Sequence, residues 1–599
     1  MGVFRVIEHE CDLCVVGGGL AGTITALSDA RKGFKVVLVL DRPMLGGNSS
    51  SEIRMWVRGA KGKYNREGGI LAEFEEENIY RNPTLAPTLW DSVLYGKIKE
   101  NKNITLLLNS SCLDAECNDN KIASITAWQL TTYTYHKVKA KYFADCSGDS
   151  ILAPLSGAEY KLGRNSKNEF NEDIGPEIED NKTMGMSLLI QARETEKKVD
   201  FIPPSFANVY ETDEDFAIIP YLEGQHKTFR DHKIGTSGCN LWWMELGGDT
   251  GIPIENTEET RDELIKVAFG IWDHIKNKGD HGFDNWELEW VGFLPGKRES
   301  RRYIGDYVLT QRDIESGGNF NDVVAYGGWP MDDHNPRGML ANKPTDAPSY
   351  FYPAPSPYGI PYRCLYSKNI DNLLFAGRNI SATHAGLSST RVMATCSLLG
   401  QAVGNAVSLC VKHEISPREV YNNHINELQQ QILDDGVFLP NVKREISSLT
   451  RESSINLSTE EVESLLSGID RPRTFDLENG VELKVGEELI FTFKESKVIN
   501  KLRIMFDPDY DRLSLSPNKK MRVFAQKLHQ GLDFEPMKVA SSLVKDFEVY
   551  VDGKLAYSNT NNYNSLVKIE LGKMAKEVRV KFNKTWGKDK VRIFACDLI

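Results

Sequence analysis

The sequence predicts an α/β protein that continues into an all-β region near its C-terminal end. A strand–helix–strand unit with three closely spaced glycines spans residues 12–41. Apolar strand-like runs then alternate with helical patterns up to about residue 415. After residue 471 the chain changes to short apolar runs divided by Gly, Asn and Asp turns, which is typical of a sheet without helices.

The composition is that of a globular protein with several structural units. The chain has 599 residues, of which 41% are hydrophobic and 26% are charged. At ~100–200 residues per domain, this length corresponds to about three to five units. A formal net charge of −12 argues against non-specific binding to nucleic acid or to an anionic membrane surface, so we expect neither partner.

The cysteines and the first residues bear on the compartment. The ten cysteines form no paired framework, and the first residues lack the basic and apolar segments of a signal peptide. Cys11 and Cys14 have redox-motif spacing, but positions three apart on a strand point to opposite faces, so we interpret both as structural thiols. We therefore expect a reduced, cytoplasmic protein.

Residues 12–41 form a βαβ unit suited to a dinucleotide. An apolar strand, a helix and a second apolar strand ending on an acid follow one another in register. The first glycine permits the sharp turn, the second admits a pyrophosphate, and the third lets the helix lie close to the strand. The helix N-terminus offers free N–H groups to the phosphate. The predicted binding residues are Gly17, Gly19, Leu20, Ala21, Gly22, Asp41 and Arg42.

A second glycine-rich loop, Gly46-Gly47-Asn48-Ser49, can run beside a flat ring or a phosphate. With the βαβ unit, this loop makes the chain resemble the FAD-dependent oxidoreductases with a glutathione-reductase-like nucleotide-binding fold. The resemblance implies that the cofactor is FAD, that Asp41 binds the adenosine ribose, and that the four loop residues lie near the flavin. The family more often has Glu at the ribose position, and Asp41 should still reach it.

Helical and strand patterns alternate between residues 67 and 149. Residues 67–100 show two apolar helical faces. Strands predicted at 104–108, 122–129 and 133–140 resemble the β-meander of the same fold. The stretch Asp145-Cys-Ser-Gly148-Asp149 is similar to a family signature, which implies that Gly148 and Asp149 bind FAD. A left-handed turn at Gly148 would explain the same residues.

Residues 161–365 are more polar and irregular, and we interpret them as an inserted α+β substrate domain, as the family implies. A helix is predicted over 256–278. The cluster Arg298-Glu-Ser-Arg301-Arg302 can bind carboxylate or phosphate groups in bidentate fashion, or it can form a salt-bridged strand end.

The loop 326–337 packs a histidine, two acids and an arginine between Gly and Pro residues. Such a loop can present a general base oriented by an acid, or it can be a hydrogen-bonded structural loop. Because no second His or Cys lies at the usual ligand spacing, we expect no metal site. The candidate catalytic residues are Arg301, Asp333, His334 and His384.

His384 belongs to residues 366–415, in which a strand, a polar loop and an apolar helix over about 392–411 follow one another. The small residues of this helix predict close packing on the sheet. The resemblance implies that the segment returns to the FAD-binding domain and caps the flavin, with His384 beside flavin or substrate. The cofactor-binding residues expected here are Gly377, Arg378, Ser389, Thr390 and Arg391.

Residues 416–470 are predicted to be a helical connection, and residues 471–599 a β-sandwich. Short strands are expected at 481–485, 489–494, 502–506, 523–527, 547–551, 566–571, 578–582 and 591–596. The pattern resembles a galactose-binding-like jelly roll, which binds carbohydrate in some proteins and braces the core in others.

Together these patterns predict a Rossmann-like FAD-binding domain in residues 1–160 and 366–415, interrupted by the substrate domain. We predict hydride transfer between a small-molecule substrate and flavin N5, with His334 or His384 handling the coupled proton. A sugar, polyol or hydroxy acid is the expected substrate. The alternatives are a flavin-dependent reductase of an unsaturated substrate, and a non-catalytic carbohydrate-binding or scaffold protein with a vestigial nucleotide fold.

Overall fold

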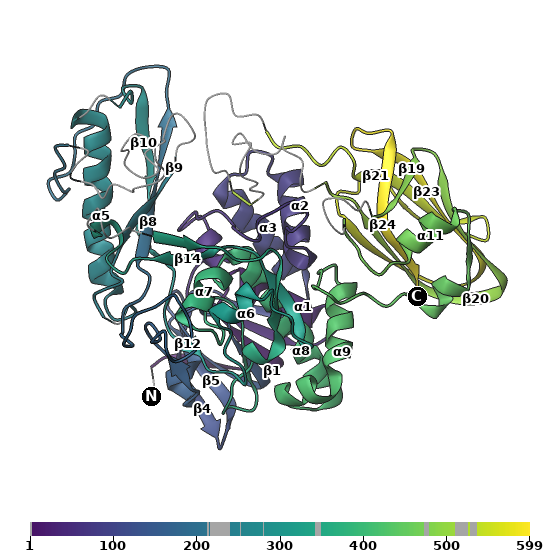
Figure 1. Ribbon diagram of the computed structural model, residues 1–599, viewed down its shortest axis with the longest axis horizontal. Helices are drawn as coiled ribbons and strands as arrows, with labels where there is room; N and C mark the ends of the chain where they lie inside the picture. Colours follow the sequence, from purple (N-terminus) through teal and green to yellow (C-terminus); the bar gives the residue numbers. More distant parts are fainter. Residues whose placement is uncertain are drawn as a thin grey trace.

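The chain forms a central α/β region, with a smaller α+β region on one side and a β-rich C-terminal region on the other (Figure 1). The computed structural model describes residues 3–212, 215, 240–251, 253–278, 281–341, 349–472, 479–509, 525–526 and 536–599.

The central region is built on a seven-stranded sheet with the order β3-β2-β1-β6-β5-β4, in which β17 also pairs with β6. Five of its strands, β3, β2, β1, β6 and β17, run parallel, and β4 and β5 extend the first half of β6 as an antiparallel meander. Val16 and Phe375 both pair with Asp145, so three strands end together at the edge where such sheets bind ligands. The strands are β1 (Arg5–Val16), β2 (Val36–Val39), β3 (Ile104–Leu107), β4 (Ser110–Asn118), β5 (Lys121–Gln129), β6 (Thr134–Asp145) and β17 (Leu373–Phe375).

Five longer helices surround this sheet: α1 (Leu20–Ala30), α2 (Gly69–Arg81), α3 (Pro87–Glu100), α8 (Met393–His413) and α9 (Pro417–Asp434). Two small residues of α8, Gly400 and Gly404, pack closely on α1. A Cβ on Gly400 would lie 2.2 Å from the Ala21 carbonyl oxygen, and one on Gly404 would lie 2.6 Å from that of Thr25. Of the described helices, α8 alone is long and apolar enough to cross a membrane, but 94% of its apolar window is buried inside the protein, as in a core helix.

The helices and strands predicted between residues 67 and 140 are confirmed, with one strand missed. β4 was not predicted because its sequence is mostly polar, and in the structure most of its side chains are exposed. The prediction of a continuous loop over 326–337 is wrong, because β14 (Met331–His334) lies within it and pairs with β15 (Ser349–Tyr352). The partner strand lies well downstream, so the local pattern did not reveal it.

The α+β region consists of a four-stranded sheet and the helix α5 (Thr257–Asp273). The helix predicted over 256–278 is confirmed, and its last turn, His274–Lys278, is π-helical. Leu264, Ala268 and Ile271 are buried in the core between the helix and this sheet. The strands are β8 (Met186–Glu194), β9 (Asn240–Leu246), β10 (Trp286–Val291) and β11 (Gly296–Lys297).

Short elements connect these regions. They are α4 (Leu152–Ser156), α6 (Gln311–Glu315), α7 (His384–Thr390), α10 (Ser448–Glu452), α11 (Thr459–Leu465), β7 (Tyr160–Lys161), β12 (Arg302–Tyr303), β13 (Val323–Gly327) and β16 (Tyr358–Pro361).

The C-terminal region is a seven-stranded sheet with the order β19-β24-β20-β23-β21-β22, in which β18 also pairs with β20. Two pairs of predicted strands, 489–494 with 502–506 and 566–571 with 578–582, are halves of the long strands β20 and β23, which pair through two register shifts. The predicted strand 523–527 falls largely outside the described residues, and β22 was not predicted. The strands are β18 (Ser454–Ile455), β19 (Val481–Lys484), β20 (Glu488–Phe506), β21 (Val544–Val551), β22 (Lys554–Asn559), β23 (Leu566–Thr585) and β24 (Lys590–Leu598).

This C-terminal region is attached to α2 and α9 of the central region. The Ser565 N–H donates to Glu76 Oε2 at 2.9 Å, and the Tyr563 ring stacks on Tyr80 at 4.2 Å. Lys568 Nζ lies 2.9 Å from an Asp435 carboxylate oxygen. The two regions are therefore joined by hydrogen bonds, ring stacking and ion pairs rather than by the chain alone.

Candidate active site

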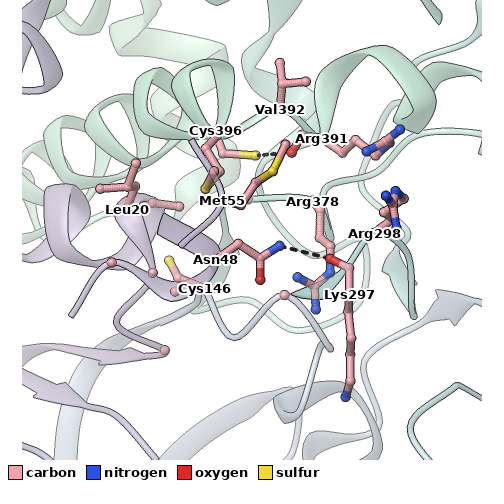
Figure 2. Close-up of a pocket in the computed structure, with 18 of the residues that line it drawn as sticks. Leu20, Asn48, Met55, Cys146, Lys297, Arg298, Arg378, Arg391, Val392 and Cys396 are labelled. Atoms are coloured by element: carbon pink, nitrogen blue, oxygen red, sulfur yellow. Dashed lines mark hydrogen bonds between the residues drawn. The ribbon is translucent and has the colours of Figure 1, made fainter. Parts of the chain in front are cut away.

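The strand ends described above open into a cavity of about 1320 Å³. Figure 2 shows Lys297, Arg298 and Arg391 on one side of the cavity and Leu20 and Cys146 on the other. Most of the predicted site residues line it: Gly17, Gly19, Leu20, Ala21, Asp41, Arg42, Gly46, Gly47, Asn48, Gly148, Asp149, Arg301, His334, Gly377, Arg378 and Arg391.

The three glycines of the βαβ unit differ in their surroundings. At Gly17, φ is +104° and a Cβ would lie 2.4 Å from the Cys146 carbonyl carbon, so only glycine fits there. At Gly22 a Cβ would lie 1.9 Å from the Gly17 oxygen, which explains why this glycine packs the helix on the strand and does not line the cavity. At Gly19 the nearest atom is the Gly47 Cα at 3.9 Å, which leaves open space on the cavity side.

The start of α1 offers polar groups to this space. Gly19 is its N-cap residue, and no side chain caps the first N–H groups of the helix. These groups and the positive end of the helix dipole favour an anion. Asp41, at the end of the second strand of the unit, lines the same end of the cavity, with its carboxylate 3.6 Å from Arg42.

Ser49 shapes the second glycine-rich loop from behind. It is fully buried and does not line the cavity. Its hydroxyl donates to the Gly46 carbonyl at 2.9 Å and accepts from Trp90 Nε1 at 3.1 Å. Asn48, which does line the cavity, donates to the Lys297 carbonyl at 3.2 Å (Figure 2).

Asp149 holds two cations at the middle of the cavity. Its carboxylate accepts from Arg378 and from Lys297, both at 2.8 Å. Burial alone would raise the pKa of Asp149, but the two cations outweigh burial and lower it to about 2. A Cβ on Gly148 would lie 2.8 Å from the Arg378 guanidinium carbon, so a glycine at this position lets the guanidinium approach.

His334 is the histidine on the cavity wall. It is 5% exposed, and its Nδ1 lies 2.6 Å from Glu245 Oε2 while its Nε2 lies 3.2 Å from Asp332 Oδ1. Burial would raise the pKa of Glu245, but Arg298 and His334 outweigh it, so that carboxyl is ionised. The Glu245 carboxylate is therefore placed to accept a hydrogen bond from Nδ1, while Nε2 lies beside Asp332 on the cavity wall.

His384 lies behind this wall and does not line the cavity, contrary to the expectation that it sits beside flavin or substrate. Its Nδ1 lies 2.9 Å from Glu299 Oε2, and its Nε2 lies 2.9 Å from Asp333 Oδ1. Burial lowers the pKa of His384, but the two carboxylates outweigh burial and raise it to about 9. Asp333, also predicted to be catalytic, is likewise absent from the cavity wall.

The alternation of β14 explains this division. Successive side chains of a strand point to opposite faces, so Asp332 and His334 face the cavity whereas Asp333 faces His384. In the sequence, Asp332, Asp333 and His334 form one cluster. The strand separates them, with Asp332 and His334 on one face and Asp333 on the other.

In the arginine cluster, both interpretations of the sequence apply: some of its arginines face the cavity, and another forms a structural ion pair. Arg298 and Arg301 line the cavity. Arg302 is fully buried, pairs with Glu299, and donates to the Ala382 carbonyl at 3.0 Å. The first two arginines therefore reach the cavity, and the third is structural.

Ser389 and Thr390, predicted to bind cofactor, also lie outside the cavity wall. The Ser389 hydroxyl donates to the Trp329 carbonyl at 2.5 Å, and that of Thr390 donates to the Gly386 carbonyl at 3.2 Å. Both residues lie in α7, the short helix before Arg391.

Several cavity residues were not predicted. Arg58 and Lys61 follow the second glycine-rich loop, and both lie over the Trp329 ring, at 5.8 Å and 4.7 Å from its centroid. The only signal for them was three cations, at positions 58, 61 and 63, within six residues. Lys61 forms no ion pair with any described residue, and burial lowers its pKa.

Three buried donors on the cavity wall have no hydrogen-bond partner among the described residues: Trp329 Nε1, Arg378 Nε and Arg391 Nε. Leaving a buried donor unsatisfied costs roughly 1–3 kcal/mol, so such groups usually have a partner. Acceptor-rich ligands would satisfy them.

The cavity fits FAD. Gly19 and the uncapped start of α1 leave room and donors for a pyrophosphate, and Asp41 offers a carboxylate at the same end. The orphaned Arg378 N–H lies further along the wall. These are groups that a dinucleotide requires.

Known proteins resemble parts of the chain. Over 85 residues it is 35% identical to glycerol-3-phosphate dehydrogenase 2 of Mycobacterium tuberculosis and to glycerol-3-phosphate dehydrogenase of Mycobacterium leprae. The match covers 14% of this chain and 14% of each relative, so the chain spans only a small part of their length.

Solved structures give distant matches. A geranylgeranyl bacteriochlorophyll reductase-like protein from Thermoplasma acidophilum is 12% identical, with a TM-score of 0.33 over 72% of this chain and 86% of that one. Glycerol-3-phosphate dehydrogenase from Bacillus halodurans, complexed with FAD, is 15% identical, with a TM-score of 0.19 over 33% of this chain and 43% of that one.

The family comparison covers most of the chain. Residues 12–432 match a family described as FAD dependent oxidoreductase. This range contains the βαβ unit, the second glycine-rich loop and the whole cavity wall. The chain belongs to the FAD dependent oxidoreductase family, and its cofactor is FAD.

Proposed function

We propose that the protein transfers a hydride between FAD and a hydroxyl-bearing carbon of a small anion, such as a hydroxy acid or a phosphorylated polyol. The observation that supports this most is the cavity end beyond the glycine-rich loops, which four cations line: Arg58, Lys61, Arg298 and Arg391. Guanidinium and ammonium groups bind carboxylate and phosphate in charge-assisted hydrogen bonds.

The proposed cofactor end uses the residues that were predicted from the sequence. Gly17, Gly19 and the start of α1 would hold the pyrophosphate, and Asp41 the ribose. Bound FAD supplies a two-electron acceptor, so the chain itself has to bind and orient the substrate and move one proton.

His334 is the proposed proton-transfer residue. Glu245 holds its Nδ1 proton at 2.6 Å, which orients the ring and leaves Nε2 to take the hydroxyl proton as the hydride departs. Asp332, 3.2 Å from Nε2, could pass the proton on. His384 is not assigned this role because, unlike His334, it does not line the cavity.

Arg391 and the aromatic residues would position the substrate. Arg391 Nη2 donates to the Asp332 carbonyl at 2.9 Å, while its Nε has no partner among the described residues. Trp329 and Phe351 also line this end and supply apolar surface for the carbon skeleton. The curated relatives are named for glycerol 3-phosphate, a polyol phosphate, which is compatible with this class.

For the C-terminal region, we propose a bracing role. Its contacts with α2 and α9 support this role. We further propose that this region is a galactose-binding-like sandwich, that residues 161–365 form an inserted substrate domain, and that the protein is cytoplasmic.

Anaerobic reduction of the bound flavin tests the function. Matched pairs of substrates, each an anion and its uncharged analogue, are mixed with the oxidised holoprotein in a stopped-flow instrument. We expect flavin bleaching with at least one hydroxy acid or polyol phosphate and little with its uncharged analogue. Equal rates for both members would contradict the anionic class. Reoxidation of reduced flavin by unsaturated acids, without reduction by any alcohol, would favour the reductase alternative.

A further inference from the structure

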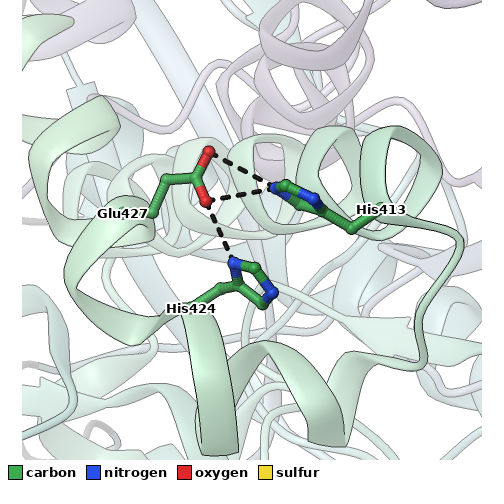
Figure 3. A group of neighbouring side chains, drawn as sticks. All are labelled: His413, His424 and Glu427. Atoms are coloured by element: carbon green, nitrogen blue, oxygen red, sulfur yellow. Dashed lines mark hydrogen bonds and ion pairs between the residues drawn. The ribbon is translucent and has the colours of Figure 1, made fainter.

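Two histidines and a glutamate converge where α8 meets α9 (Figure 3). His413 is the last residue of α8, and His424 and Glu427 lie on α9. Glu427 Oε2 lies 3.2 Å from His413 Nε2 and 3.0 Å from His424 Nδ1. The two imidazole rings stack, with centroids 4.2 Å apart. One nitrogen from each ring and one carboxylate oxygen therefore share a small volume.

These separations suit ligands of a single metal ion. Zinc binds histidine nitrogen and carboxylate oxygen at about 2.0–2.2 Å, which places the ligand atoms of a tetrahedral site about 3.3 Å apart. The three ligand atoms here all lie within 4.8 Å of one another. Among the residues that the structure describes, this is the one group of three or more His, Cys, Asp or Glu side chains that converges in this way.

The site is accessible, and the second carboxylate oxygen of Glu427 has its own partner. The side chains of His413, His424 and Glu427 are 29%, 27% and 32% exposed, so an ion can enter and water can complete its coordination. Lys412 Nζ pairs with the other carboxylate oxygen of Glu427, at 2.7 Å.

The backbone is irregular at one of the three residues. His424 has φ −131° and ψ 15° inside α9, and this departure from helical geometry interrupts the helix. Helix breaks usually have an identifiable cause such as Pro or Gly, and neither lies at this point of α9. The break instead coincides with a side chain of the converging group.

We propose that His413, His424 and Glu427 bind a divalent transition-metal ion of the zinc class, which joins the end of α8 to α9. Imidazole with one carboxylate suits Zn²⁺, whereas Mg²⁺ and Ca²⁺ need more oxygen ligands. The 21 residues of α8, at ~1.5 Å per residue, separate this site by about 30 Å from Met393 on the cavity wall. The proposal is therefore independent of the reaction proposed above.

Equilibrium dialysis of the FAD-loaded full chain, after removal of metals with a chelator, tests the site. Bound zinc is measured by elemental analysis. We expect one zinc per chain, with at least a tenfold weaker affinity in Glu427→Gln and no specific binding in the double variant His413→Ala/His424→Ala. Excess Mg²⁺ should not displace the zinc. Glu427→Gln also serves as the conservative variant if the double variant does not fold.

The chain provides a matched control. His9 and His136 form another histidine pair, with Nε2 and Nδ1 2.9 Å apart and no carboxylate in contact with either ring nitrogen among the described residues. His9→Ala should keep full zinc binding. Zinc should raise the melting temperature of the wild type and of His9→Ala but not that of the double variant. Equal zinc binding by the wild type and the double variant, or no binding by the wild type, would overturn the proposal.

Discussion

At one end of the cavity the wall is made of backbone, and at the other it is made of charged and aromatic side chains. The glycine-rich end comes from Gly17, Gly19, Gly46 and Gly47, which leave space and N–H groups. The other end brings together residues 58–61, 298–301 and 329–334. At the glycine-rich end, the residue type matters only where a side chain would collide with neighbouring backbone atoms. At the other end, the lining depends on which side chains of several distant segments point into the cavity.

The two buried histidines illustrate how similar side chains can either line the cavity or lie behind its wall. His334 and His384 each pair with a buried glutamate, Glu245 and Glu299 respectively. The second ring nitrogen of each lies near an aspartate, Asp332 and Asp333 respectively, but His334 lines the cavity and His384 does not. Similar partners thus accompany an accessible histidine in one case and a structural ion pair in the other.

Four substitutions test this comparison, and they are ordered by their expected effect on substrate-driven flavin reduction.

The largest effect is expected for Gly19→Val, which places a side chain in the space open to the pyrophosphate. Because a Cβ at Gly19 meets no atom closer than 3.9 Å, the apoprotein should fold while losing stoichiometric FAD. The FAD-to-protein ratio and the circular dichroism spectrum measure the two effects. Gly96→Val, where a Cβ meets nothing within 4 Å, is the control. Full retention of FAD by Gly19→Val would refute the placement of the cofactor.

His334→Gln should keep FAD but slow reduction by the substrate roughly 10²–10⁴-fold, the usual contribution of a general base. Stopped-flow absorbance measures the rate, and reduction by dithionite, which needs no base, should be unchanged. An unaltered substrate rate would rule out His334 as the proton-transfer residue.

Arg391→Met should lower kcat/KM for the anionic substrate roughly 10–100-fold, the expected loss of one charged hydrogen bond. An uncharged analogue should be affected much less, because it does not use the guanidinium. Arg312→Met provides the matched control, since Arg312 is exposed and pairs with Asp173 and Glu315 outside the cavity. Equal losses with both substrates would indicate a structural role for Arg391.

His384→Gln should change the rate of flavin reduction least, by less than about threefold. Its effect is on stability, where breaking a buried ion pair costs about 3–5 kcal/mol. The folded pKa of about 9 lies above the unfolded value of 6.5, so protonation favours the folded state. This stabilisation is complete below pH 6.5 and is lost as the pH rises through 9.

Melting temperatures of both proteins across this range test the sign. The difference between wild type and His384→Gln should be largest at the acidic end and shrink towards alkaline pH. A difference that grows with pH would contradict the assignment of the raised pKa to His384.

Much of the glycine-rich end was predictable from local sequence. The βαβ unit, the Gly46–Gly47 turn and the strand ending before Gly377 are each specified within about forty residues, and their chemistry is that of backbone conformation and helix termini. Arg298, Arg301 and His334 line the cavity, whereas six other predicted site residues do not: Gly22, Ser49, Asp333, His384, Ser389 and Thr390. Most of these six are one or two positions from a lining residue, a difference that the sequence pattern does not resolve.

The sequence by itself predicted that this chain binds a dinucleotide at a glycine-rich end, because the spacing of the glycines between a strand and a helix is specific to such sites. Only the tertiary structure decided which face of β14 meets the cavity, which arginine of the 298–302 cluster is structural, and that β20 and β23 are continuous strands. The same holds for the meeting of His413, His424 and Glu427. Each of these features depends on a partner segment that is distant in the sequence. In a strand, side chains alternate between the two faces, so a shift of one residue moves a side chain from the cavity face to the opposite face.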